Sequence, residues 1–116
     1  MEKDILTFNN DEYLHPMLYS NIIGTAIYLR KFDEAKNIIS KYKERVSPER
    51  RDTAVNFNMA KLLFAENKYD EAHEYLSKVQ QEDVFYKVAI KGLYAQIYYE
   101  KEFTETELKN TLLNLK

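Results

Sequence analysis

The sequence has no cysteine and no tryptophan, and it has only 2 glycines and 2 prolines among its 116 residues. Without cysteine there are no disulfides, thiolate zinc sites, iron–sulfur clusters or cysteine nucleophiles. All-β folds and glycine-rich phosphate loops need many more turn residues than this chain has. The scarcity of glycine and proline therefore favours long helices joined by short turns.

An excess of one charge sign is also lacking, since 17 Lys and Arg stand against 19 Asp and Glu, for a net charge of −2. A chain without a basic excess has no field that attracts nucleic acid or an anionic membrane. No apolar run is long enough to span a membrane, and residues 1–4 do not open a signal peptide. We therefore expect a cytoplasmic protein that binds neither nucleic acid nor membrane.

Apolar residues recur with helical spacing between clear breakers. Pro16 suits the first turn of a helix, Ser47 and Pro48 suit an N-cap and first helical position, and Asn67 suits a helix end. Asp83 can cap a fifth helix, and Thr104 with Glu107 has the spacing of a capping box that would open a sixth. The pattern predicts six helices, which begin near residues 16, 32, 48, 69, 84 and 104.

Two helix starts are nearly identical. Residues 31–35 read Lys-Phe-Asp-Glu-Ala, residues 68–72 read Lys-Tyr-Asp-Glu-Ala, and Lys101 to Phe103 form a partial third copy. Phe32 and Tyr69 are 37 positions apart, and Tyr69 and Phe103 are 34 apart. An aromatic at such a start packs back on the preceding helix, and the small Ala lets the two helices approach closely. Repeats of this length indicate stacked helical hairpins.

These segments resemble the tetratricopeptide repeat family. The resemblance implies an all-α fold of antiparallel helical hairpins, stacked as a short right-handed solenoid of about six helices. It is good on the second helices of the first two units, degenerate on the first helices, and lost after Phe103, where Thr106 and Asn110 occupy apolar slots. Another helical solenoid or a plain helix bundle is the alternative.

The resemblance also divides the chain. Residues 1–15 are interpreted as a lead-in or the end of a preceding repeat, and residues 16–116 as a repeat domain with units at about 16–47, 48–82 and 83–116. Leu112, Leu113 and Leu115 end the pattern without a polar capping helix. We therefore expect a segment of a larger bacterial repeat protein, whose uncapped C-terminal hairpin could associate with a second copy.

No residues combine into a recognisable catalytic motif. Two histidines are too few for a metal site; we interpret His15 as a helix-entry residue and His73 as a surface residue. Gly24 and Gly92 lie inside predicted helices, either for close packing or to leave room for a ligand. The basic segment 41–51 either holds an acidic partner or is a solvated turn between units. We expect no enzymatic activity, cofactor or metal.

The resemblance implies a binding groove lined by the first helix of each unit. A full basic set that would clamp a peptide carboxylate is absent, so the groove suits an extended or helical peptide, unless its aromatic residues serve packing alone. The implied function is a non-enzymatic protein–protein interaction module or scaffold. The alternatives are a structural segment that positions or caps another domain, and a ligand-sensing regulator. The implied partner-binding residues are Asn21, Tyr28, Phe57, Asn58, Lys61, Lys91, Tyr98 and Tyr99.

Overall fold

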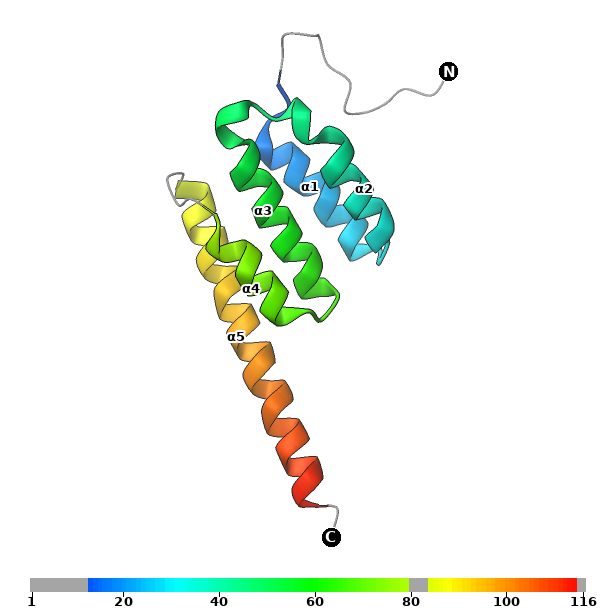
Figure 1. The fold of residues 1–116 in the computed structure, drawn as a ribbon, viewed down its shortest axis with the longest axis vertical. Coiled ribbons are helices and arrows are strands. Elements are labelled where there is room, and N and C mark those ends of the chain that lie inside the picture. The colour runs from blue at the N-terminus through cyan, green and yellow to red at the C-terminus, as the bar shows by residue number, and fades with distance from the viewer. Residues whose placement is uncertain (1–12, 80–83, 115–116) are drawn as a thin grey trace.

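A computed structural model describes residues 13–79 and 84–114, and these ranges contain helices and no strand (Figure 1). The all-α prediction is confirmed. Helices α1 and α2 form one antiparallel hairpin, α3 and α4 form the next beside it, and α5 lies along the second hairpin and projects beyond it (Figure 1). The handedness of the stack stays a prediction. The helices are α1 (Pro16–Tyr28), α2 (Phe32–Tyr42), the 3-10 turn η1 (Lys43–Arg45), α3 (Pro48–Ala65), α4 (Tyr69–Ser77) and α5 (Val84–Leu113).

The turns of the two hairpins are built in the same way. Arg30 and Asn67 adopt left-handed backbone angles, with φ of 62° and 64°. In each turn the backbone N–H of the next residue donates to the carbonyl five positions earlier. Lys31 donates to the Ala26 carbonyl at 2.9 Å, and Lys68 donates to the Leu63 carbonyl at 2.8 Å. This is the Schellman arrangement, which satisfies the last carbonyls of a helix while it reverses the chain. The helix end predicted at Asn67 is confirmed.

The small and aromatic residues of the repeated segments lie where the pattern predicts. Ala35 and Ala72 are completely buried, so each second helix approaches its first helix closely. The Tyr69 ring packs on Phe64, with ring centroids 5.5 Å apart. The buried Tyr19 hydroxyl donates to the Ile39 carbonyl at 2.8 Å and joins α1 to α2. Burial raises the pKa of Tyr19 above its ordinary value, with a smaller contribution from Tyr86.

The described α-helices start where the sequence predicts, but not every predicted capping hydrogen bond forms. Pro16 and Pro48 open α1 and α3, and the His15 Nδ1 accepts from the Met17 N–H at 3.0 Å, which confirms the helix-entry interpretation. The Ser47 side chain makes no capping hydrogen bond. Of the interpreted lead-in, residues 1–12 lie outside the described residues.

The third unit departs from the prediction. α5 is one continuous helix of 30 residues, so the separate sixth helix and the capping box of Thr104 and Glu107 are wrong. The position equivalent to Arg30 and Asn67 is Lys101, and residues 98–109 contain no Gly, Asn or Pro that would end a helix. Thr106 also replaces the alanine that a returning helix needs. Asp83, expected to cap α5, lies outside the described residues.

Candidate functional site

A cleft runs between α1, α3 and α5, the first helices of the three units. One part has a volume of about 440 Å³ and lies between α1, the end of α3 and the middle of α5. The other has a volume of about 370 Å³ and continues toward the start of α5. Lys61, Leu93 and Gln96 line both parts, so the two form one surface. The cleft lies where the resemblance placed the groove.

Lys61 is the central charged group of this cleft. Its Nζ lies 3.4 Å from the Ser20 carbonyl, to which it donates, and 5.6 Å from the centre of the Phe57 ring. In the described part of the chain no carboxylate forms an ion pair with it. Burial lowers the pKa of Lys61, because the charged form has lost part of its water. The ammonium can therefore gain from a polar or anionic group that enters the cleft.

Both glycines border this cleft. A Cβ atom built at Gly24 would lie 3.4 Å from the Lys61 Nζ, at van der Waals contact, whereas one built at Gly92 would meet nothing within 4 Å. Gly92 therefore leaves open space rather than allowing a close contact. Of the two interpretations of these glycines, room in the cleft fits Gly92.

Four of the implied partner-binding residues line the cleft. Asn21, Phe57 and Lys61 border its second part, and Tyr28 borders the first. Tyr28 is 84% exposed and makes the most accessible apolar surface there. Phe57 is mostly buried and meets Tyr86 edge-on at 5.4 Å between ring centroids. Phe57 therefore forms the floor of the cleft more than its wall.

Asn58 is not at the cleft surface, and its expected position there is wrong. Its side chain is completely buried between α1 and α3. The Nδ2 atom donates to the Ser20 Oγ at 2.9 Å and to the Ala54 carbonyl at 2.8 Å. Asn21 occupies the equivalent slot in α1 and is exposed. The two asparagines differ because α1 covers this face of α3, whereas no described helix covers the same face of α1.

The three implied residues of α5 also lie away from the cleft. Tyr98 turns toward α4, where its hydroxyl is 3.2 Å from the His73 Nε2, and its ring stacks on Tyr94 at 6.1 Å. Tyr99 stacks on Phe103 at 6.2 Å, and Lys91 is exposed without bordering either part of the cleft.

The sequence-based alignment of Phe103 with Phe32 and Tyr69 assigned the wrong side of α5 to the cleft. The residues of α5 that do line the cleft are Ala89, Gly92, Leu93 and Gln96. Gln96 was missed. The sequence could have indicated it, because Gln96 lies four residues after Gly92 and therefore on the same side of the helix.

His73 is half-buried rather than a plain surface residue, because the rings of Tyr94 and Tyr98 lie 5.3 and 5.8 Å from its own. Near it, Lys101 of α5 forms an ion pair with Asp70 at the start of α4, with Nζ 2.5 Å from Oδ1. Among residues 13–79 and 84–114, no three His, Asp or Glu side chains gather as a metal site would require. The helices in these ranges include none that could cross a membrane.

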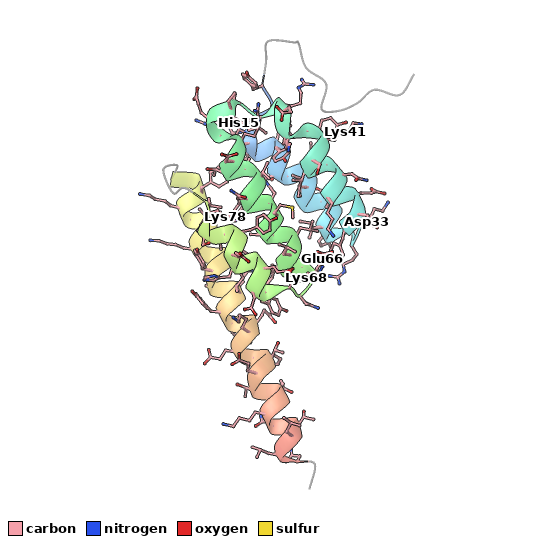
Figure 2. All side chains as sticks on the ribbon, viewed as in Figure 1. His15, Asp33, Lys41, Glu66, Lys68 and Lys78 are labelled. Atoms are coloured by element: carbon pink, nitrogen blue, oxygen red, sulfur yellow. The ribbon has the colours of Figure 1, made fainter. Side chains whose placement is uncertain are left out.

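In the basic segment 41–51, Arg51 stabilises the turn between α2 and α3. Arg51 donates to the backbone carbonyls of Lys43, Glu44 and Val46 at 3.0 to 3.2 Å, and it pairs with the Glu44 carboxylate at 3.3 Å. These contacts favour the turn interpretation over an acidic partner. The labelled side chains His15 and Lys41 lie at this end of the hairpins, whereas Asp33, Glu66 and Lys68 mark the hairpin turns at the other end (Figure 2).

Stacked helical hairpins with a cleft along their first helices define a helical-repeat domain. The family model described as the Tetratricopeptide repeat protein 21 ARM repeat matches residues 3–106, and the chain belongs to this family. The resemblance to tetratricopeptide-like helical repeats is therefore confirmed, while the bacterial source stays a prediction. No curated protein and no solved structure matches the chain. A helical-repeat family supports a protein-interaction or structural repeat role.

Proposed function

We propose that this chain is a non-enzymatic interaction module that binds a peptide segment of another protein in the cleft between α1, α3 and α5. The observation that carries the proposal is Lys61, a partly desolvated ammonium at the centre of an open cleft with no carboxylate partner among the described residues. Around it, Tyr28 offers an exposed ring, and Asn21 and Gln96 offer amides. An extended or helical peptide needs such mixed polar and aromatic contacts.

The two glycines make a direct test of this proposal. Selective ¹⁵N labelling of glycine gives two amide signals, from Gly24 and Gly92, and both report on the cleft. The probe is a displayed library of random peptides, selected on the chain and then added to the labelled protein. We expect selected peptides to shift both signals.

A matched pair of variants separates the cleft from the rest of α5. Gly92→Leu places a side chain in open space inside the cleft, whereas Ala95→Leu places the same side chain on an exposed part of α5 outside it. Binding should fall at least about tenfold in Gly92→Leu, because a filled cleft excludes the peptide. It should be unchanged in Ala95→Leu.

Two outcomes contradict the proposal. Selection that yields no binding peptide favours the alternative, a structural repeat segment that positions or caps another domain. Peptides use another surface if they bind Gly92→Leu as tightly as the parent chain and leave both glycine signals of the parent chain unmoved. A thermal shift on addition of small metabolites would instead favour the ligand-sensing regulator. The cytoplasmic location stays a prediction.

A further inference from the structure

The projecting half of α5 carries a stripe of uncharged residues that no described helix covers. From Tyr99 the stripe continues through Phe103, Thr106 and Asn110 to Leu113, with spacings of four, three, four and three. This spacing keeps all five on one side of a helix. Tyr99, Phe103 and Leu113 are 65%, 51% and 56% exposed. A helix that presents rings and a leucine to water at regular spacing is ready to pack against another helix.

The side of α5 that already has a partner is a different one. Ile90 and Ile97 are completely buried against the second hairpin, and Tyr94 and Tyr98 turn toward His73 of α4. At about 100° of rotation per residue, Tyr99 and Thr106 lie on nearly the opposite side from Ile97. The stripe is therefore separate from the contacts that hold α5 in place, and it continues beyond Gly92 and Gln96 of the cleft on the same side of the helix.

We propose that the stripe Tyr99–Leu113 pairs with the same stripe of a second copy of this chain, in an antiparallel arrangement with Thr106 on the twofold axis. In this register Tyr99 faces the partner's Leu113, since each lies seven positions from Thr106. The hairpins of each copy border its α5 up to Glu105, just before Thr106, so the two hairpin bodies lie on opposite sides of the axis and do not meet.

The charges beside the stripe select this register. Glu102 and Lys109 are seven positions apart and lie on the same flank of the stripe. A twofold axis places each flank against the same flank of the partner, so Glu102 meets the partner's Lys109, and the converse pair forms by symmetry. A register shifted toward the start of α5 would cover more of the helix, but it would set Lys91 against the partner's Lys109. Opposite charges thus favour the first register and like charges disfavour the second.

One contact in this dimer is unfavourable. Glu107 lies on the other flank, one position from Thr106, so it comes close to its own copy across the axis. The paired stripe spans about 21 Å of helix, at 1.5 Å per residue. Its area is roughly half of the ~800 Å² per partner of a standard interface, so we expect micromolar or weaker association.

The test is sedimentation of the 116-residue chain over a concentration series, with charge variants. Glu102→Lys and Lys109→Glu should each weaken the dimer by roughly tenfold, because each creates two like-charge contacts. The double variant restores both pairs with reversed sign and should return the dissociation constant to near that of the parent chain. Glu107→Gln should tighten the dimer. These side chains are exposed, so helicity by circular dichroism should not change.

The absence of cysteine gives a second, independent test of the register. Thr106→Cys should form a disulfide-linked dimer on mild oxidation, because residue 106 meets its own copy at the axis. Ala95→Cys, also exposed but away from the axis, should form no disulfide-linked dimer. A chain that stays monomeric at all concentrations would overturn the proposal and leave the stripe to a different partner. Equal cross-linking of the two variants, or no rescue by the double charge reversal, would overturn it as well.

Discussion

The chain reverses after α1 and after α3, but at the equivalent point of α5 it continues as a helix. Arg30 and Asn67 take left-handed angles at the two turns, whereas Lys101, in the same slot, stays helical and pairs with Asp70. The aromatic of the repeated segment is present all three times, as Phe32, Tyr69 and Phe103. The aromatic alone therefore does not make a hairpin.

The small residue three positions later distinguishes the three sites. Ala35 and Ala72 are completely buried where the second helix of each hairpin approaches the first, and Thr106 at the third site is exposed. Without a left-handed residue and a small contact, continuing the helix satisfies more backbone hydrogen bonds than turning. The comparison teaches that the hairpin is specified by a pair of local features.

The largest expected effect comes from filling the two close contacts. Ala35→Leu and Ala72→Leu should each lower the free energy of unfolding by about 1–3 kcal/mol, because added carbons overpack a completely buried site. Urea unfolding followed by circular dichroism measures it. Ala95→Leu on the exposed part of α5 is the control and should change little. An unchanged stability of either hairpin variant would show that the two hairpins are not equivalent.

The two asparagines in equivalent slots test how stacking changes a repeated position. Asn58→Ala should cost about 1–2 kcal/mol, because it removes buried hydrogen bonds to Ser20 and Ala54. Asn21→Ala should stay within about 0.5 kcal/mol of the parent chain, since Asn21 is exposed. Thermal and urea unfolding measure both. Equal losses of stability at the two positions would contradict the finding that Asn58 is buried and Asn21 is exposed.

A smaller effect is expected at the left-handed turn residues. Arg30→Gly should stabilise the chain by about 0.5–1 kcal/mol, because a β-carbon is strained at positive φ. Asn67→Gly should gain only about a few tenths of a kcal/mol, since asparagine tolerates this conformation better. Lys31→Gly is the control: its φ is −96°, so glycine brings no relief and should destabilise. A stability loss in Arg30→Gly would mean that the arginine's position over the Phe32 ring outweighs the strain.

The smallest effect concerns the ion pair between α4 and α5. The Lys101 ammonium holds the pKa of Asp70 below its ordinary value, and Asp70 raises the pKa of Lys101. The stabilisation is thus present at neutral pH and is lost on acidification, as the pH falls through the lowered pKa of Asp70. Because both groups are exposed, the effect should be small and should fade with salt.

Comparison with Asp70→Asn isolates this contribution. At low salt the parent chain should lose more stability between neutral pH and about pH 3 than the variant does. Stability curves that run parallel over this range would show that the pair contributes nothing. The same measurement on Lys101→Met should give the same pH dependence as Asp70→Asn, because either change removes the pair.

The fold could be read largely from the sequence because its signals are local. Proline at the first helical position, asparagine at a helix end and the repeated alanine act within one or two turns of helix, and each lies where the pattern placed it. The cleft was also foreseen on the correct helices. Its composition was only half predictable: Asn21, Tyr28, Phe57 and Lys61 line it, and Lys91, Tyr98 and Tyr99 do not.

The sequence by itself determined that this chain forms helical hairpins, since capping, helix propensity and apolar spacing are properties of short segments. Only the tertiary structure decided which of two equivalent asparagines is buried and how α5 is rotated. These features depend on what packs beside a residue, because α1 covers Asn58 and the second hairpin holds Tyr98. Neighbouring helices are not encoded in local spacing, so the same residue type in the same slot can end as core in one unit and as surface in another.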